Sequence, residues 1–474
     1  MPPKFQPQRI RDPLHDLIEF EPSDFENALW RVINTRPFQR LRRIRQLGFS
    51  DLTFPGATHS RFAHSIGAFH TARMLMQIIE RHLKKREHYD EVKAQTALAA
   101  ALVHDVGHGP FSHSFEEVGK RLGLKMAIHE NVSESLIRDG EIADALRQRG
   151  SGFANDVADL VAGIGEKHLY GSVVSSQFDA DRLDYMRRDR LMTGTQHGGI
   201  DFTWLLANLE IGTIPLAEEE NKLGDLETLV LGPKSFHAAE AYVLGLFQLY
   251  PTVYFHKATR GAEKLFSELL IRVIAHAKDG GANETGLPMN HPVAVFARDP
   301  EKIDGVLNLD DSVVWGGLSM MADAGDKVIA DLATRLRDRK LYKAIDVRKD
   351  IAARMDPNTE EVRRETAIEK ACAEVERKIV ERLKDSNAGS PKVLLDKGVR
   401  SPYKGLQESK GPLNQIYIRT AQGELVDIKA QSKVVAASEN FNFFRVYVPE
   451  MGDDGGELVQ KLIAEEAENV KQSG

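Results

Sequence analysis

Histidine and aspartate side chains gather in one short stretch, 101-ALVHDVGHGPFSHSFEE-117, where an Ala-rich run meets a Gly/Pro bend. Burying neutral imidazoles and a carboxylate costs free energy unless a partner pairs with them. Neighbours in the middle of a helix point about 100° apart, so they rarely share one ligand. At a helix end the backbone is released, and His104 and Asp105 can turn to one point. The spacing therefore predicts two ligands of a metal centre.

A tight metal site needs further ligands from other segments of the chain. His64 is the expected third ligand, and the fourth is expected from 178-FDADRLDYMRRD-189, which holds Asp179, Asp181 and Asp184. Two histidines and two carboxylates suit manganese, iron, zinc or magnesium, with water in the open positions. Such a site can activate water and hold phosphate oxygens. For a lone histidine elsewhere, an ordinary surface or hydrogen-bonded residue is the simpler interpretation.

The composition sets limits on the class of protein. The chain has 474 residues, 42% of them hydrophobic and 28% charged, which suits one large core with appendages or two to three domains. The net charge of −7 provides no global basic field for nucleic acid. Cys372 is the single cysteine, so any metal must be held by His, Asp or Glu. No signal-peptide pattern and no apolar run of about 20 residues is seen, so we expect a cytoplasmic protein.

Helical periodicity dominates from Ser23 to about residue 278, after an irregular N-terminal segment with a turn and a short strand. Short apolar runs at 208–232 predict strands, and QIYIRTAQGELVDIKA predicts a β-hairpin around Gln422-Gly423. The expected fold class is mainly α, with small β elements and a C-terminal α+β appendage. The longer predicted helices span 64–82, 91–104, 129–139, 153–165, 177–190, 235–278, 310–340, 359–384 and 457–474, and loops are expected at 279–300 and 385–392.

Four motifs occur together in the first half of the chain, namely RFAHSIG, HDVGHGPFSH, HE at 129–130 and DADRLDYMRRD. With these motifs the chain resembles the HD-domain phosphohydrolase superfamily. Within it the chain is similar to the deoxynucleoside triphosphate (dNTP) triphosphohydrolases, including the mammalian members that fuse a sterile-alpha-motif domain to the HD domain. The resemblance covers about residues 9 to 260. It continues more weakly through LDDSVVWGGL and RKLYKAID to about residue 346.

The resemblance implies a domain organisation and an activity. We expect an irregular segment at 1–22, an HD phosphohydrolase domain at 23–278 and a C-terminal extension at 279–474 with helices and a β-hairpin. The implied reaction is hydrolysis of dNTPs to deoxynucleoside and inorganic triphosphate, through attack on the α-phosphorus by a water that the metal activates. The implied cofactor is a divalent manganese, iron, zinc, nickel or magnesium ion. Members of this family usually form homo-oligomers, so a dimer or tetramer is expected.

The resemblance also assigns roles to individual residues. His113 and Glu116 lie three residues apart on one helix face, so the carboxylate can orient the imidazole that acts as general acid for the departing 5′-oxygen. His108 and His129 would line the same pocket and contact phosphate. The implied metal ligands are His64, His104, Asp105 and Asp181.

A further set of residues is implied to bind the substrate. Arg61 would hold the α-phosphate, a role that suits a bidentate guanidinium. Gln46 and Leu47, with Asp189, would hold the 3′-hydroxyl and leave no room at the 2′ position. The residues implied to face phosphate, sugar and base are Arg182, Tyr185 and Tyr254.

The sequence departs from the family pattern at the far end of the triphosphate site. Leu246 stands where the mammalian-type enzymes have an arginine that reaches the terminal phosphate, and Tyr250 stands in place of a histidine. Either another basic residue, such as Arg182, Arg187 or Lys257, compensates, or the preferred substrate is shorter than a triphosphate.

A second departure concerns regulation by nucleotides. Asn34 occupies the position of an aspartate that reads guanine in the activated family members, although Gln39 and Arg42 match. An uncharged amide cannot accept both guanine N–H donors as a carboxylate does. A nucleotide effector near these three residues is thus one hypothesis, and Asn34 argues against guanine as its base.

The segment 36-RPFQRLRRIR-45 carries five arginines. A basic helix of this kind can bind single-stranded nucleic acid, but no aromatic ladder accompanies it. A solvated or nucleotide-facing helix face is the favoured interpretation.

Two other functions stay open at this point. The first keeps the HD chemistry but changes the phosphate ester, as in a nucleotidase, a cyclic-nucleotide or alarmone hydrolase, or a nuclease. Leu246 favours it, while the sugar-facing residues count against an alarmone. The second is a catalytically silent scaffold that senses nucleotides, and the complete set of expected ligands counts against it.

Overall fold

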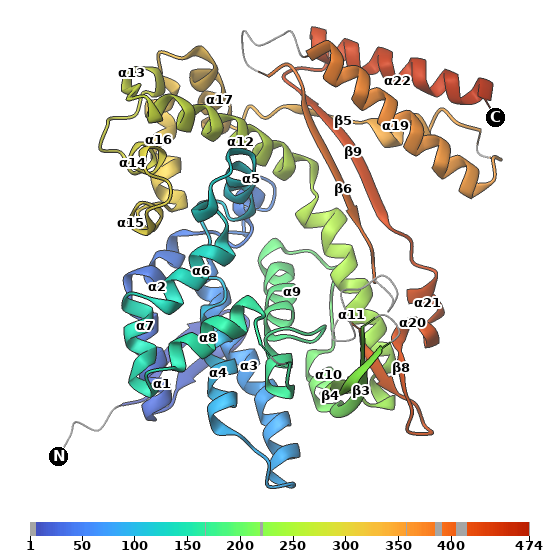
Figure 1. The fold of residues 1–474 in the computed structure, drawn as a ribbon. Coiled ribbons are helices and arrows are strands. Elements are labelled where there is room, and N and C mark those ends of the chain that lie inside the picture. The colour runs from blue at the N-terminus through green and yellow to red at the C-terminus, as the bar shows by residue number, and fades with distance from the viewer. Residues whose placement is uncertain are drawn as a thin grey trace. The chain divides into compact units, whose positions relative to one another are not determined.

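The computed structural model describes residues 6–165, 167–218, 221–356, 358–383, 391–403 and 415–473. It confirms a mainly α-helical protein with small β-sheets (Figure 1). The chain divides into two compact units. The first comprises residues 1–253, 299–312 and 401–439, and the second comprises 254–298, 313–400 and 440–474. The domain boundaries that we derived from the sequence stay predictions.

Most of the first unit is helical. Its longer helices are α1 (Asp24–Ile33), α3 (Arg61–Lys84), α4 (Glu91–Val103), α5 (His113–Leu122), α6 (His129–Arg138), α8 (Phe153–Ala162), α9 (Ala180–Thr193) and α11 (Phe236–Leu249). Its shorter helices are α2 (Arg36–Arg40), α7 (Glu141–Leu146), α10 (Phe202–Ala207), α15 (Ile303–Leu307), α20 (Ile428–Gln431) and α21 (Lys433–Ala436).

Helices α3, α4 and α9 form the centre of the first unit, and α3 packs against both of the others (Figure 1). Each begins at a polar residue whose side chain accepts a backbone N–H of the first turn, which is Ser60 for α3, Asp90 for α4 and Asp179 for α9. These caps fix where the first turn of each helix starts. Because α3 and α9 carry predicted ligands near their first turns, the caps also set the positions of those ligands.

The N-terminal segment is more regular than the sequence indicated. Strands β1 (Gln8–Asp12) and β2 (Asp16–Phe20) pair antiparallel, with Ile10 opposite Ile18. The tight turn between them closes at Asp16, which has a φ of 60°. An aspartate tolerates this left-handed conformation better than most residues, but it is a weak turn signal without a neighbouring glycine.

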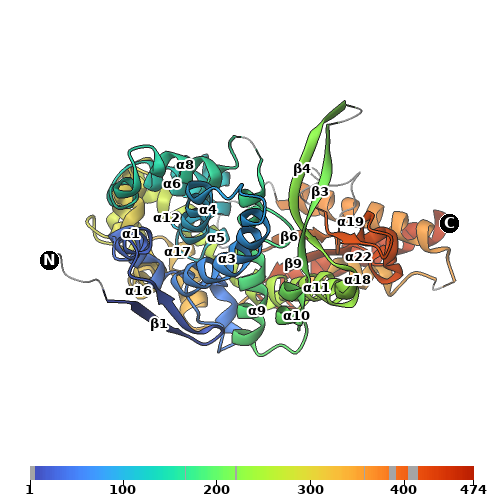
Figure 2. The same ribbon diagram turned by 90° about the horizontal axis from the view of Figure 1, so that it is seen from below.

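Four strands of the first unit form one sheet in the order β3-β4-β7-β8. The strands are β3 (Leu209–Glu218), β4 (Asn221–Leu231), β7 (Tyr417–Arg419) and β8 (Leu425–Asp427). β3 and β4 pair antiparallel as a long ribbon (Figure 2), and β7 joins β4 in parallel. The predicted strands and the predicted hairpin are thus confirmed, and Gly423 takes the positive φ of 91° in the hairpin turn.

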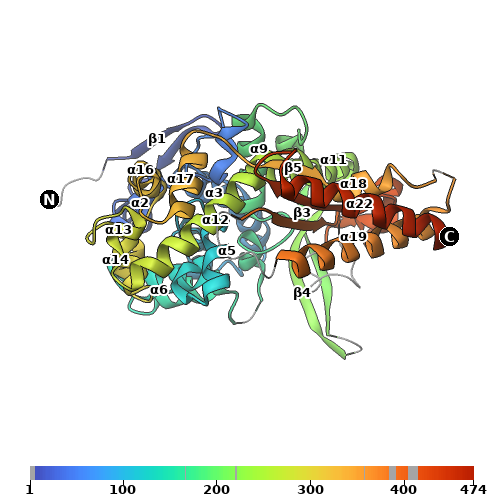
Figure 3. The same ribbon diagram turned by 90° about the horizontal axis from the view of Figure 1, so that it is seen from above.

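The second unit combines helices with a three-stranded sheet in the order β5-β9-β6. Helices α19 and α22 lie side by side (Figure 3), and their Val375, Ile379 and Leu462 are buried in one apolar core with Val446 of the sheet. The strands are β5 (Lys343–Asp346), β6 (Leu394–Arg400) and β9 (Phe441–Val448). The helices are α12 (Lys257–Lys278), α13 (Ala282–Thr285), α14 (Pro292–Arg298), α16 (Asp311–Ala322), α17 (Lys327–Arg337), α18 (Val347–Ala352), α19 (Glu361–Leu383) and α22 (Asp454–Ser473), and α16 begins in the first unit.

The prediction of one helix over 235–278 was wrong. Helix α11 ends at Leu249, a π-helical turn spans Tyr250–Tyr254, and α12 starts at Lys257. Pro251 explains the interruption, since it lacks the N–H that a continuous helix needs.

The sequence also predicts two loops, at 279–300 and 385–392. Residues 279–300 contain the short helices α13 and α14 rather than a plain loop. Most of the break predicted at 385–392 lies outside the described residues. Among the helices that the structure describes, none has the length and apolar character needed to cross a membrane.

Candidate metal centre and active site

Three helices bring the four predicted metal ligands together. His64 lies in the first turns of α3, His104 and Asp105 follow the last turn of α4, and Asp181 lies in the first turn of α9. The His64 and His104 rings are 5.4 Å apart between centroids. Asp181 Oδ1 lies 3.0 Å from His64 Nε2 and 3.6 Å from His104 Nε2. Asp105 Oδ1 is 3.4 Å from His104 Nε2. Helix ends far apart in the sequence thus converge on one point.

The orientation of the two imidazoles fits a bound cation. His64 Nδ1 donates to Asp184 Oδ2 at 2.9 Å, and His104 Nδ1 donates to the Ala101 carbonyl at 3.0 Å. Both Nε2 atoms are buried and make no hydrogen bond of good geometry with the described residues. Outward bonding at Nδ1 directs the Nε2 lone pair inward, as in metal-binding histidines. The side chain of His64 is fully buried, whereas that of Asp181 is 41% exposed, so the centre opens on the Asp181 side.

The electrostatics of the centre also favour positive charge. Burial alone would lower the pKa of His64, but the carboxylates of Asp181 and Asp184 outweigh it and raise the pKa to about 10. Burial opposes protonation of His104 too, yet Asp105 and Asp181 raise its pKa. The same carboxylates would offset the charge of a divalent ion, which would take the place of the Nε2 protons because a metal-binding imidazole is neutral. The residues present therefore fit the predicted metal.

Beside this centre, Glu116 binds two histidines. Its Oε1 accepts from His129 Nδ1, and its Oε2 accepts from His113 Nδ1 at 3.3 Å. The rings of His108 and His129 stack at 3.9 Å between centroids. His108 Nε2 lies 3.3 Å from Asp105 Oδ1, which links this group to the metal centre. The His113 side chain is 76% exposed and so is open to a substrate.

The charge state of Glu116 follows from these contacts. Burial alone would raise its pKa, but the hydrogen bonds from His113 and His129 outweigh burial and hold the pKa well below the usual value. The carboxyl is thus ionised at neutral pH. An ionised Glu116 accepts the Nδ1–H groups of both imidazoles and fixes their ring orientation.

Arg61, the predicted phosphate ligand, lies at the start of α3 next to the metal centre. Its guanidinium is buried, pairs with Asp105 and donates through Nε to Ser112 Oγ at 2.8 Å. Arg182 lies one residue after Asp181 and binds Asp179 together with the carbonyl of Ser176. Asp179 therefore serves as a cap and an arginine partner rather than facing the imidazoles.

The residues predicted to face the sugar are joined by His59. The backbone carbonyl of His59 accepts the backbone N–H of Gln46 at 3.0 Å. The imidazole of His59 donates through Nε2 to Asp189 Oδ1 at 2.8 Å. Gln46 Oε1 is buried without a hydrogen-bond partner among the described residues, which leaves an acceptor for a hydroxyl group. Leu47 follows Gln46 directly and precedes the 3-10 turn Gly48–Leu52. His59 was not singled out from the sequence, although it lies five residues before His64.

Tyr185 and Tyr254 are the other two residues predicted to contact the substrate. Tyr185 is half-buried on α9, where burial raises its pKa well above the usual value. Tyr254 is the first residue of the second unit, so its contact with a base or sugar stays a prediction.

The residues predicted near an effector bind one another or their own helix ends. Asn34 donates to the Trp30 carbonyl at 2.7 Å, and Gln39 donates to the Ile33 carbonyl at 2.8 Å. Arg42 donates to Gln39 Oε1 at 2.8 Å and its guanidinium lies over the Phe62 ring. An effector site there stays a prediction.

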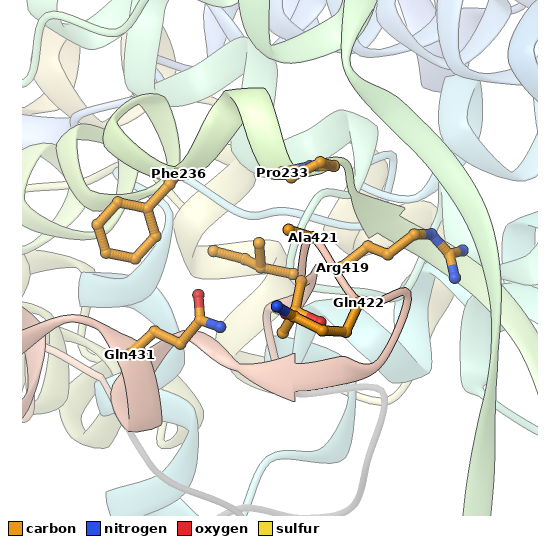
Figure 4. A pocket seen from close by; sticks show the side chains of 8 residues that line it. Pro233, Phe236, Arg419, Ala421, Gln422 and Gln431 are labelled. Carbon is orange, nitrogen blue, oxygen red and sulfur yellow. The ribbon is translucent and has the colours of Figure 1, made fainter.

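A hollow of about 440 Å³ lies elsewhere on the first unit (Figure 4). Phe236 and Pro233 line it on one side, and Arg419, Gln422 and Gln431 line it on the other. It shares no residue with the predicted site, and none of its lining side chains offers a metal ligand of the His, Asp or Glu type.

Sequence reasoning missed the buried ionic network behind His64. Asp184 accepts from His64, from His15 Nε2 at 2.7 Å and from Arg188 Nε at 2.8 Å. Arg188 also donates to Asp12 Oδ2 at 2.7 Å. His15 and Asp12 belong to the N-terminal hairpin, which carried no signal of this role. The network holds the ring of His64 from behind.

Asp184→Asn is expected to weaken divalent-ion binding roughly 10- to 100-fold, because the carboxylate that orients His64 and raises its basicity is lost. Titration calorimetry with Mn²⁺ measures the change. The matched control is Glu26→Gln, which alters another buried carboxylate that pairs with an arginine, Arg73. Equal Mn²⁺ affinity in Asp184→Asn and the wild type would show that Asp184 does not tune the centre.

Comparison with known proteins agrees with the fold. The family model described as HD domain matches residues 61–189. The uncharacterized protein YwfO of Bacillus subtilis is 34% identical over 338 residues, which cover 71% of this chain and 71% of YwfO. The chain belongs to the HD-domain family.

Two further relatives extend the comparison. The deoxynucleoside triphosphate triphosphohydrolase SAMHD1 of Xenopus laevis is 28% identical over 317 residues, which are 58% of this chain and 46% of SAMHD1. The crystal structure of a phosphohydrolase from Bacteroides thetaiotaomicron shares the fold, with a TM-score of 0.68 and 23% identity over 94% of this chain and all of that chain.

Proposed function

We propose that the protein hydrolyses deoxynucleoside triphosphates to deoxynucleoside and inorganic triphosphate. The observation that carries the proposal is the convergence of His64, His104, Asp105 and Asp181 beside the His113–Glu116 pair. The similarity to SAMHD1, whose name states this activity, supports the same substrate class.

The residues divide the chemistry between them. His64, His104, Asp105 and Asp181 would hold a divalent manganese, iron, zinc, nickel or magnesium ion. When bound, such an ion lowers the pKa of water and offsets negative charge on phosphate oxygens. Arg61 stabilises the charge that develops at the α-phosphate. His113, oriented by Glu116, gives a proton to the departing 5′-oxygen.

The sugar side of the site favours a deoxynucleotide. Gln46 and Asp189, joined through His59, offer buried polar groups to a 3′-hydroxyl. Polar groups that bind the 3′-hydroxyl select against a sugar that lacks it. Selection against a 2′-hydroxyl would come from the lack of room that the family resemblance assigns to Gln46 and Leu47. We therefore propose that ribonucleotides are poor substrates. From the family resemblance we also propose that the active form is a homo-oligomer.

A second candidate is the hydrolysis of a shorter phosphate ester at the same centre. Leu246 is 6% exposed on α11, so an apolar buried side chain stands where related enzymes carry an arginine for the terminal phosphate. This substitution removes one source of charge for a triphosphate tail.

Product analysis distinguishes the two candidates. We expect purified protein with Mn²⁺ to convert dNTPs to deoxynucleoside and tripolyphosphate, as separated by ion chromatography, and to process ribonucleotides at least 100-fold more slowly. Chelation with EDTA is expected to stop the reaction, and added Mn²⁺ to restore it. Release of inorganic phosphate or pyrophosphate from dNTPs would refute the proposal, and hydrolysis of deoxynucleoside monophosphates without hydrolysis of dNTPs would favour the second candidate.

A further inference from the structure

The arginine-rich segment at 36–45 docks onto a distant stretch of the same unit, 308-NLDD-311. Arg36 donates to Asn308 Oδ1 at 2.6 Å, and Arg43 donates to Asp310 Oδ2 at 2.6 Å. Two further bonds run from Arg40 to the Leu309 carbonyl, at 2.8 Å, and from the backbone N–H of Arg45 to Asp311 Oδ2, at 2.9 Å. The side chains of Arg36, Arg40 and Arg43 thus bind this stretch, although Arg36 and Arg43 remain exposed.

Arg40 and Asp311 also hold the loop that carries the candidate active site. Arg40, which is 1% exposed, donates to the His108 carbonyl at 2.7 Å and to the Val106 carbonyl at 3.3 Å. Asp311 Oδ1 accepts the backbone N–H of Phe111 at 2.7 Å. Asp311 is itself buried, and its two oxygens bind two separate backbone segments.

The loop needs such support because its backbone is strained. Phe111 has a φ of 53° and Ser112 a φ of 55°, although neither is glycine. A bulky residue at positive φ is strained and persists only where surrounding contacts hold it. The contacts of Phe111 include its N–H bond to Asp311 and the stacking of its ring on Phe49 at 4.1 Å between centroids.

The strained turn positions two groups of the proposed reaction. Ser112 Oγ accepts from Arg61 Nε at 2.8 Å and donates to the Arg45 carbonyl at 3.1 Å. His113 follows immediately as the first residue of α5. A shift of the turn therefore moves the predicted phosphate ligand and the predicted general acid together.

We propose that Asp311 is a positioning residue, which fixes the strained Phe111–Ser112 turn and thereby places Arg61 and His113 for catalysis. The role in catalysis rests on the proposed function, whereas the hold on the turn does not. Asp311 is the second aspartate of the motif LDDSVVWGGL, where the family resemblance is weaker. It binds the active-site loop although the two lie about two hundred residues apart in the sequence.

Asp311→Asn tests the proposal, with Asp310→Asn as the matched control. The control changes the neighbouring carboxylate, which binds the half-exposed Arg43 side chain. In hydrogen-exchange mass spectrometry, we expect a peptide spanning residues 108–115 to exchange at least tenfold faster in Asp311→Asn and to keep its wild-type rate in Asp310→Asn. With dNTP as substrate, we expect kcat to fall roughly 10- to 100-fold in Asp311→Asn, with KM and bound metal nearly unchanged, because small misplacements of reacting groups cost this much.

The outcomes test separately whether Asp311 holds the turn and whether the turn positions Arg61 and His113. Unchanged exchange in folded Asp311→Asn would show that Asp311 does not hold the turn. Faster exchange with kcat within threefold of the wild type would show that the turn does not position the reacting groups. If the wild type hydrolyses no dNTP, the proposed function fails, while the exchange experiment still reports on the turn.

A second variant covers the case in which Asp311→Asn does not fold. Ser112→Ala leaves Asp311 in place and removes the hydroxyl that accepts from Arg61 and donates to the Arg45 carbonyl. We expect it to lower kcat at least fivefold without faster exchange in the 108–115 peptide. Wild-type kcat in Ser112→Ala would break the link from the turn to Arg61 and overturn the proposal.

Discussion

His104→Ala is expected to lower kcat/KM for dNTP hydrolysis by on the order of 10³-fold or more, which corresponds to about 4 kcal/mol of transition-state stabilisation. His104 Nε2 is buried, lacks a good hydrogen bond in the described structure and faces both Asp105 and Asp181. Alanine removes this nitrogen ligand and leaves two carboxylates and His64, a set that holds a divalent ion weakly. Metal analysis by mass spectrometry should therefore show a matching loss of bound metal.

The control for this variant is His237→Ala. His237 is a histidine of the same unit whose side chain is 93% exposed and pairs with Glu240 on the surface. It should keep the wild-type metal content and rate. If His104→Ala kept a full complement of metal and normal turnover, the candidate metal centre would be assigned to the wrong residues.

The convergence of the candidate metal ligands was predictable because each lies in a short motif with its own local signal. His104 and Asp105 end a helix at a Gly/Pro bend, and His64 follows a serine that caps α3. The spacing alone left three aspartates open for the fourth position, and the family resemblance selected Asp181. The structure separates them, since Asp179 caps α9, Asp181 faces the imidazoles and Asp184 lies behind His64. Helical rotation of about 100° per residue points the three in different directions, but the side that faces α3 depends on packing.

The supporting residues could not be predicted in this way. His15 lies in a hairpin that precedes the helical body, and Asp311 lies two hundred residues beyond the turn that it binds. Each makes its contacts only after the chain has folded, and neither lies in a pattern with a local structural meaning. The strain at Phe111 was equally hidden, because a phenylalanine gives no sign of a positive φ. Sequence motifs thus predicted which groups meet at the candidate site, and tertiary contacts determine how those groups are held.

His113→Ala is expected to lower kcat for dNTPs by roughly 10²- to 10³-fold, the usual contribution of a general acid. The exposed ring of His113 can reach a substrate, while its Nδ1–H donates to the ionised Glu116. A poor leaving group such as a 5′-alkoxide needs the proton that this imidazole delivers. The bound metal should stay at the wild-type level. The described contacts of His113 are with Glu116, His108 and His129, and none of these is a candidate metal ligand.

The choice of leaving group makes this prediction specific. With bis(p-nitrophenyl) phosphate, the departing phenolate is stable without a proton, so His113→Ala should lose less than about fivefold in rate. Glu116→Gln should show the same contrast at a smaller size, because the amide keeps one acceptor oxygen for the two Nδ1–H groups of His113 and His129 and loses the negative charge. An equal loss on both substrates would instead assign His113 to substrate binding. The ratio of the two losses therefore reports proton transfer separately from folding, metal content and affinity.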